Sequence, residues 1–308
     1  MVSTVDGTSG VISWWTNETT AGAVTINRRT VTDPAGPTQH HRVAIAGLQS
    51  GIGYRYTVTS DGARASGKLR TAARPGQAFS FAVIGDFGGG GPGATQNAAR
   101  ISSADTEFIQ TVGDNVYPAS GLPDPDFAMT YSDFDQRFFK PFGRTINGQA
   151  FFPANGNKES YSDGQWWDAF PMPGDNHSWY SYDYGDAHIL VLDTEIPYRP
   201  GTEQYRFAEA DLRAHQNAKW RIVVTHRPPY SSTNAGASDV GVREHLVPLF
   251  EAQKVHLVVS GNSHNYERTE PMLRDAEAKV GGVTYLVTGA GGNGFNCLLY
   301  TSPSPRDS

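Results

Sequence analysis

The sequence predicts an α/β layered domain preceded by a small all-β sandwich. Residues 1–73 contain short β-rich segments at close spacing, separated by turn residues, which is typical of a β-sandwich. From Phe79 onward, apolar strand-like runs alternate with helical stretches, which is typical of a layered α/β domain. A chain of 308 residues can bury a core in each of two such domains.

The β-rich region is predicted to hold five strands, at residues 11–16, 23–30, 41–48, 54–60 and 65–71. Turn formers separate them, such as Asp33-Pro34 and Ser60-Asp61-Gly62. A sandwich of this type has about seven strands. We therefore expect the first strand to be missing and the N-terminus to be truncated. The linker to the next domain is predicted at residues 71–77.

The layered region is predicted to contain six buried strands, with its clearest helices at residues 96–103 and 203–215. Four of the strands, at residues 81–85, 108–113, 220–225 and 255–261, run into a polar residue of a type that binds metals. These residues and their near neighbours are Asp86, Asp114, Tyr117, His226, Asn262 and His264.

The polar residues at the strand ends are expected to converge, because ligands of open α/β sheets bind outside the carboxyl ends of the strands. Carboxylate, imidazole and amide donors without a thiolate indicate a hard-to-borderline metal ion. An aspartate after a strand is also common as a turn former or a helix cap. Four strands that end in this way favour the metal site.

Five segments of the chain resemble, in order and spacing, the motifs of the calcineurin-like metallophosphoesterases. They are Gly85-Asp86-Phe87-Gly88, Gly113-Asp114-Asn115-Val116-Tyr117, Gly156-Asn157-Lys158-Glu159, Val224-Thr225-His226-Arg227 and Gly261-Asn262-Ser263-His264. With a tyrosine three residues after Asp114, the chain resembles the purple acid phosphatase branch of that family. The resemblance extends over residues 10–292.

The resemblance implies a four-layer αββα sandwich at residues 77–296, truncated at its C-terminus, after a fibronectin type III-like domain at residues 1–73. It also implies a metal-dependent phosphoester hydrolase, similar to acid phosphatases, that acts on a small phosphorylated substrate. By the same resemblance we expect a secreted, periplasmic or extracellular protein. Residues 1–4 show neither the basic start nor the apolar stretch of a signal peptide.

The resemblance further implies two metal ions that share Asp114 as a bridging ligand. Asp86, Tyr117 and His264 would complete the first site, and Asn157, His226 and Asn262 the second. A phenolate ligand suits Fe(III), and the partner ion would be Zn, Fe or Mn. Two ions ~3.5–4 Å apart would let a metal-bound hydroxide attack phosphorus.

Two positions depart from the family pattern. Lys158 replaces the histidine of the Gly-Asn-His motif, and Asn262 replaces the first histidine of Gly-His-x-His. An ammonium can hold a phosphate as a point charge but is a poor general acid at neutral pH. We predict that Lys158 acts in catalysis and substrate binding, and that Arg227 also contacts the phosphate.

The change at Asn262 also supports a second interpretation. An amide is a weaker ligand than imidazole for Zn or Fe, so the second metal should bind less tightly. The alternative is therefore a non-catalytic extracellular binding module with a degenerate metal site. The other histidines, including His188 and His215, are interpreted as structural or solvent-exposed.

Several segments outside the five motifs carry further predictions. Residues 88–93, rich in glycine, could cradle a phosphate or form a loop without a ligand. Trp166 and Trp167 are candidates for a substrate rim, whereas residues 180–184 are predicted to be an edge strand with aromatic residues on the core. Residues 297–308, with the only cysteine, Cys297, are predicted to be a non-native, adapter-derived tail without regular structure.

Composition excludes some classes of function. The net charge of −6 at pH 7 argues against a nucleic acid or an anionic membrane as the partner. No run approaches the ~18 apolar residues needed to span a membrane. The sequence gives no indication of the oligomeric state.

Overall fold

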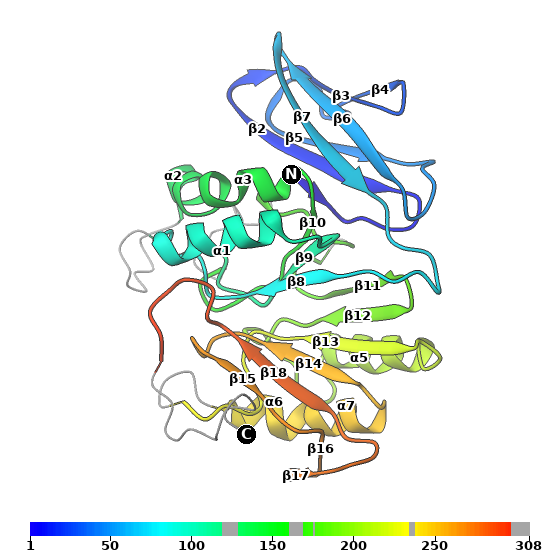
Figure 1. The fold of residues 1–308 in the computed structure, drawn as a ribbon, viewed down its shortest axis with the longest axis vertical. Coiled ribbons are helices and arrows are strands. Elements are labelled where there is room, and N and C mark those ends of the chain that lie inside the picture. Colours follow the sequence, from blue (N-terminus) through cyan, green and yellow to red (C-terminus); the bar gives the residue numbers. More distant parts are fainter. Residues whose placement is uncertain (119–128, 160–168, 175, 234–237, 297–308) are drawn as a thin grey trace.

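The structure is a computed structural model that describes residues 1–118, 129–159, 169–174, 176–233 and 238–296. Figure 1 shows a β-rich N-terminal region at one end and a layered α/β region below it. The predicted tail at residues 297–308 and the candidate rim residues Trp166 and Trp167 lie outside the described residues. No helix of the described part is long and apolar enough to cross a membrane.

The N-terminal region contains seven strands rather than five. They are β1 (Val2–Ser3), β2 (Gly10–Thr20), β3 (Gly22–Ile26), β4 (Arg29–Thr32), β5 (Thr38–Ile45), β6 (Gly53–Ser60) and β7 (Ala63–Arg70). Strands β4-β3-β6-β7 form one sheet, and β2 pairs with β5 in another. The alternating buried residues of both sheets, such as Ile12, Val24 and Val58, join one core.

The single strand predicted at residues 23–30 is wrong. The chain turns back at Asn27 and Arg28, whose φ angles are 48° and 62°, and Ile26 pairs with Arg29 across a two-residue hairpin. Asn tolerates this left-handed backbone, and two consecutive positive φ angles are what a tight hairpin turn requires. The turn lacks the usual glycine, so the sequence pattern did not predict it.

Strand β1 connects the two regions through hydrogen bonds. Val2 pairs antiparallel with Ile12 of β2 and parallel with Ala150 of β10 (Ala150–Phe152). The resulting six-stranded sheet has the order β5-β2-β1-β10-β9-β8. One sheet therefore extends from the N-terminal sandwich into the layered region, and the boundary predicted near residue 73 stays a prediction.

Two sheets face each other in the layered region. The first contributes the parallel strands β8 (Phe81–Ile84), β9 (Phe108–Thr111) and β10. The second has the order β11 (Tyr180–Tyr184), β12 (Ala187–Val191), β13 (Trp220–Val224), β14 (Leu257–Ser260), β18 (Thr284–Thr288) and β15 (Tyr266–Arg268), with antiparallel strands at its two edges. A small hairpin, β16 (Met272–Leu273) and β17 (Ala276–Glu277), follows β15.

Helices cover the outer faces of the two sheets (Figure 1). The first sheet carries α1 (Pro92–Ser103) and a continuous helix made of α2 (Tyr131–Phe134), a π-helical stretch (Asp135–Phe139) and α3 (Lys140–Ile146). The second carries α5 (Glu203–Ala214), α6 (Val240–His245) and α7 (Val247–Ala252). The predicted αββα architecture is therefore confirmed.

Aromatic side chains fill the space between the sheets. The Phe152 and Tyr182 rings stack with their centroids 3.9 Å apart, and Phe108 packs on Tyr184 at 4.5 Å. The Tyr182 hydroxyl donates to Gln110 Oε1 at 2.7 Å, so its buried polar end is satisfied. Each aromatic pair contributes about 0.5–1.5 kcal/mol beyond the burial of its area. This rigid core fixes the strands whose ends carry the candidate site.

Candidate metal centre

The ends of three of the four predicted strands bring polar side chains to one place. Asp86 follows β8, Asp114 follows β9 and His226 follows β13. Their ligand atoms all lie within 4.8 Å of one another, and all three residues are buried. The two facing sheets thus contribute to a single cluster at their carboxyl edges.

The backbone at these strand ends is strained. The φ angles of Asp86, Asp114 and Asn262 are 57°, 55° and 60°, in the left-handed region that non-glycine residues rarely adopt. Each residue in this backbone conformation costs on the order of 1–3 kcal/mol of free energy, and the conformation persists only where the surrounding structure enforces it. Gly113 has a φ of 94°, and a Cβ there would lie 2.5 Å from His226 Nδ1. The glycine therefore lets the imidazole approach the β9 turn.

His264 and Tyr117 lie beside Asp86. His264 Nδ1 donates to the carbonyl of Gly294 at 2.7 Å, which leaves Nε2 3.3 Å from Asp86 Oδ1 and 3.5 Å from the Tyr117 hydroxyl. Asp86 Oδ2 accepts from the Asn262 N–H at 2.9 Å. Asp86 Oδ1 is buried without a hydrogen-bond partner. A buried carboxylate oxygen facing an imidazole and a phenol fits a cation ligand.

His226 and Asn157 lie on the other side of the cluster. His226 Nδ1 donates to the carbonyl of Val112 at 2.8 Å, and its Nε2 lies 3.4 Å from Asp114 Oδ1. The Asn157 side-chain amide lies 3.1 Å from the same Nε2. Hydrogen bonding favours the amide nitrogen facing His226 and the oxygen facing the Lys158 ammonium. As with His264, the outer nitrogen is tied to a carbonyl and the inner one faces the cluster.

Lys158 lies directly at the cluster. Its backbone N–H donates to Asp114 Oδ1 at 3.0 Å, and its Nζ lies 3.7 Å from Asp114 Oδ2. The ammonium also lies 5.4 Å from the centre of the Tyr117 ring. The side chain is 25% exposed, so it is partly open to solvent. It is therefore placed to contact both the predicted bridging carboxylate and a molecule arriving from outside.

The electrostatics of the cluster favour a cation. Burial raises the pKa of Asp86, because the carboxylate has lost its hydration. Burial alone would lower the pKa of His226, but Asp114 and Asp86 outweigh it and raise the pKa. Burial, together with the same two carboxylates, raises the pKa of the Tyr117 phenol. A bound ion would lower the pKa values of the oxygen ligands, because it stabilises their anionic forms.

Glu159 is a functional candidate that sequence reasoning missed. Its carboxylate accepts from the backbone N–H groups of Asp114 at 3.0 Å, Asn115 at 2.8 Å and Gly156 at 2.5 Å. Burial, followed by the charge of Asp114, raises its pKa to about 7. Glu159 thereby joins the turn after β9 to the turn after β10. Its place as the last residue of the Gly156-Asn157-Lys158-Glu159 motif was the available signal.

In the structure, Arg227 pairs with a carboxylate, whereas the sequence predicts that it contacts the phosphate. Its guanidinium makes two hydrogen bonds of 2.7 Å to the carboxylate of Glu195. Such a bidentate pair is strong and holds the side chain in one orientation. Phosphate binding by Arg227 therefore stays a prediction. The phosphate cradle at residues 88–93 also stays a prediction; there, Arg137 donates to the carbonyl of Gly89 at 3.1 Å.

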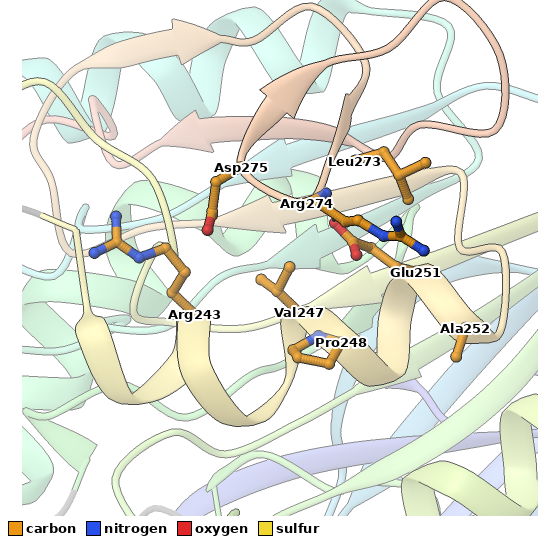
Figure 2. Close-up of a pocket in the computed structure, with 8 residues that line it drawn as sticks. All are labelled: Arg243, Val247, Pro248, Glu251, Ala252, Leu273, Arg274 and Asp275. Carbon is orange, nitrogen blue, oxygen red and sulfur yellow. Dashed lines mark hydrogen bonds between the residues drawn. The ribbon is translucent and has the colours of Figure 1, made fainter.

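A cavity of about 510 Å³ lies away from the cluster, between helices α6 and α7 and the β16–β17 hairpin (Figure 2). The carboxylates at its wall already have partners. Glu251 accepts from the Arg274 N–H at 2.7 Å, and Asp275 accepts from the Tyr230 hydroxyl at 2.6 Å. None of the predicted metal ligands lines this cavity. The cavity is therefore separate from the cluster of candidate metal ligands at the strand ends.

Comparison with known proteins identifies the family. The model of the calcineurin-like phosphoesterase family matches residues 79–266. The chain therefore belongs to this family, and the resemblance predicted from the motifs is confirmed.

The relatives that match include purple acid phosphatases. The chain is 29% identical to mouse acid phosphatase type 7 over 82% of this chain and 64% of the relative. It is 27% identical to purple acid phosphatase 21 of Arabidopsis thaliana over 82% of this chain and 58% of the relative. It is 37% identical to probable inactive purple acid phosphatase 1 of Arabidopsis thaliana over 41% of this chain and 24% of the relative. The chain spans less than two thirds of the length of each of these relatives.

A solved structure shows the same fold. Purple acid phosphatase PPD1 from yellow lupin seeds superimposes with a TM-score of 0.83 and 21% identity, over 98% of this chain and 66% of that chain. PhoD superimposes with a TM-score of 0.70 and 14% identity, over 95% of this chain and 76% of that chain. These likenesses support the β-sandwich followed by the metallophosphoesterase fold.

Proposed function

We propose that the protein is a metal-dependent phosphoester hydrolase that acts on small phosphorylated substrates. The observation that carries the proposal is the buried cluster of Asp86, Asp114 and His226, in which Asp86 Oδ1 has no hydrogen-bond partner. Two buried carboxylates close together are costly, and a cation would add to the positive charge that His226, His264 and Lys158 can offer them. The secreted or periplasmic location expected from the resemblance is part of the same proposal.

The residues present fit a two-metal centre. Asp114 would serve both ions, the first with Asp86, Tyr117 and His264, and the second with Asn157, His226 and Asn262. When bound, such ions polarise the phosphoryl group and make water a better nucleophile. The hard oxygen and borderline nitrogen donors suit Fe(III) paired with Zn, Fe or Mn.

The chain's own groups then bind and orient the substrate. The Lys158 ammonium, at the solvent-facing side of Asp114, would neutralise charge on the phosphoryl oxygens. Glu159 would keep the β9 and β10 turns in register, so that Asp114 stays in place. The burial of Asp86 and His226 excludes bulk water from the inner side of the cluster.

The test is substitution of the shared ligand. Asp114→Asn should abolish both the metal bound at this centre and the hydrolysis of p-nitrophenyl phosphate, because an amide cannot supply the bridging charge. Asp105→Asn is the matched control, since Asp105 is exposed at the other end of the same sheet. Full hydrolysis by the Asp114→Asn protein, with the control also active, would show that the two-metal mechanism is wrong.

A second candidate function is a non-catalytic binding module. Two features favour it: an amide at position 262 would be a weak ligand, and the Lys158 ammonium already lies 3.7 Å from Asp114 Oδ2. The relative that is 37% identical over part of the chain is named as probably inactive. Metal analysis combined with a phosphatase assay separates the two functions, because the module would bind ligand without turnover.

A further inference from the structure

The loop after β18 lies against the predicted first metal site. It comprises residues 289–294, belongs to none of the five motifs and received no role from sequence reasoning. The Gly85 N–H donates to the carbonyl of Thr288, the last residue of β18, at 3.2 Å. The loop therefore begins where the end of β18 meets the turn that carries Asp86.

The loop packs too closely on its neighbours for side chains at two of its positions. A Cβ at Gly289 would lie 2.7 Å from Asp86 Oδ2, and a Cβ at Gly291 would collide with the carbonyl of Gly85. The Asn97 side-chain amide, from α1, donates to the carbonyl of Gly291 at 2.9 Å. The first half of the loop is therefore held in place by its packing and by α1.

The second half of the loop contacts all three residues that would complete the first metal site. The Asn293 backbone N–H donates to the carbonyl of Asp86 at 3.3 Å. The carbonyl of Gly294 accepts from His264 Nδ1 at 2.7 Å. The Asn293 side chain is hydrogen-bonded to the Tyr117 hydroxyl. Asn293 thus joins the backbone beside one predicted ligand to the side chain of another.

The hydrogen bond to Tyr117 comes from the amide nitrogen of Asn293. Burial and the two nearby carboxylates raise the pKa of the Tyr117 phenol, and the hydrogen bond from Asn293 opposes that rise. A hydrogen bond that favours the phenolate is one that the amide N–H donates, because an anion can only accept. The packing agrees: a Cβ at Gly89 would lie 3.2 Å from Asn293 Oδ1, so the amide oxygen faces this glycine and the nitrogen is left for the phenol.

We propose that Asn293 is a positioning residue that donates its side-chain N–H to the Tyr117 oxygen and so sets how strongly this ligand binds the first metal ion. The inference rests on the proposed function and its ligand set. Groups that hydrogen-bond to metal ligands orient them and tune the metal. A donor to a phenolate withdraws electron density from it, so Fe(III) beside Tyr117 should have a higher reduction potential than it would without Asn293.

The experiment compares the full wild-type chain with Asn293→Leu, which has a similar volume and no hydrogen-bond donor. Both proteins are loaded with iron and zinc, their iron content is measured, and their absorption spectra and Fe(III)/Fe(II) potentials are recorded. We expect the phenolate-to-Fe(III) charge-transfer band of Asn293→Leu to lie at longer wavelength and its potential to be lower, because the phenolate becomes the stronger donor. Affinity for iron should fall by a factor on the order of 10.

The matched control is Asn97→Ala, since Asn97 holds the same loop through the Gly291 carbonyl and makes no hydrogen bond to Tyr117. We expect its band and potential to match those of the wild type. An equal shift in Asn97→Ala would mean that the packing of the loop, and not the amide of Asn293, sets the properties of the ligand. That result would overturn the proposal, as would an unmoved band in iron-loaded Asn293→Leu.

Two further outcomes separate this inference from the proposed function. A wild-type protein that binds iron without the charge-transfer band would show that Tyr117 is not a ligand, and it would overturn both the ligand set and the role of Asn293. A band that shifts as expected, in a protein without phosphatase activity, would support the role of Asn293 and overturn only the proposed hydrolase.

Discussion

At the scale of single residues, Lys158 governs the proposed chemistry. Its ammonium lies 3.7 Å from Asp114 Oδ2 and 5.4 Å from the centre of the Tyr117 ring, so it faces two predicted ligands. A lysine in this position adds positive charge without coordinating a metal. That charge would assist phosphate binding if Asn262, as proposed, holds the second ion only weakly.

Removal of this charge should weaken substrate binding. Lys158→Ala is expected to raise KM for a phosphomonoester about tenfold, equivalent to ~1.4 kcal/mol, while the bound metal stays constant. Steady-state kinetics and metal analysis measure the two quantities. Lys219→Ala is the control, because that lysine is 68% exposed at an unrelated salt bridge. Unchanged KM, or metal lost together with activity, would contradict the role of a point charge.

Restoration of an imidazole at position 262 should strengthen the second site. Asn262→His is expected to raise affinity for Zn²⁺ by a factor on the order of 10–100, the range seen when metal shells are altered. Competition titration measures the change. An inactive parent that gains activity only in the double variant Lys158→His with Asn262→His would instead indicate decay of the site and favour the non-catalytic module.

Glu159 should be essential for the geometry of the centre. Glu159→Gln replaces a charged acceptor of three backbone N–H groups, each such hydrogen bond contributing about 1.5–3 kcal/mol. We expect a lower unfolding midpoint and less bound metal. Glu209→Gln, on the exposed face of α5, serves as the control. Wild-type metal content in Glu159→Gln would show that the two turns do not need this carboxylate.

At the scale of elements, sequence predicts the strands better than their connections. Continuous apolar runs located β8, β9, β13 and β14 to within a few residues, and the alternation in residues 180–184 matched β11. Strand β1, only two residues long, has no such pattern and depends on its partners β2 and β10. The β3–β4 hairpin was missed because its turn has Asn27-Arg28 and no glycine.

The residues of the candidate site were likewise predictable only in part. Asp86, Asp114 and His226 follow strands, so topology alone brings them together. The role of Glu159 could not be predicted, because it acts by accepting hydrogen bonds from backbone groups that folding brings near. The pairing of Arg227 with Glu195 could not be predicted for the same reason.

Glu267 connects two elements near the site. Its carboxylate accepts from the Ser231 hydroxyl and from both the N–H and the hydroxyl of Ser232. It thereby holds the segment after β13 against β15. Burial alone would raise the pKa of Glu267, but hydrogen bonds from Ser232, Asn265 and Ser231 lower it below its usual value.

The lowered pKa gives a prediction with a definite sign. Stability contributed by Glu267 is present above its unfolded pKa and is lost as pH falls through the lower, folded pKa. Glu267→Gln should therefore destabilise the protein most at neutral pH, and the difference from wild type should shrink below about pH 4.5. Urea unfolding at a series of pH values measures this. A difference that grows on acidification would contradict the assigned contacts.

At the scale of the whole molecule, bound metal should couple to folding. An ion that binds only the folded chain stabilises it by about 2.7 kcal/mol at a concentration of 100 Kd. Chelation should therefore lower the Tm of the wild-type protein. In Asp114→Asn the decrease should be smaller. An equal decrease in the wild type and in Asp114→Asn would mean that the chelator does not act at this centre.

Strand β1 joins the sandwich to the first sheet of the layered region by hydrogen bonds, and the second sheet packs against the first through aromatic side chains to complete the frame. This frame places the ends of β8 and β9 opposite those of β13 and β14, so the centre exists only when both sheets are packed. We propose that two metal ions share Asp114 in that space.

Crystals grown with iron and zinc, and measured on both sides of each absorption edge, would test this claim most directly. We expect two anomalous peaks ~3.5–4 Å apart, both within bonding distance of Asp114. One peak should lie beside Asp86 and His264, and the other beside His226. Absence of both peaks, with the Lys158 ammonium bound to Asp114 in their place, would show that Asp114 is not shared by two metal ions.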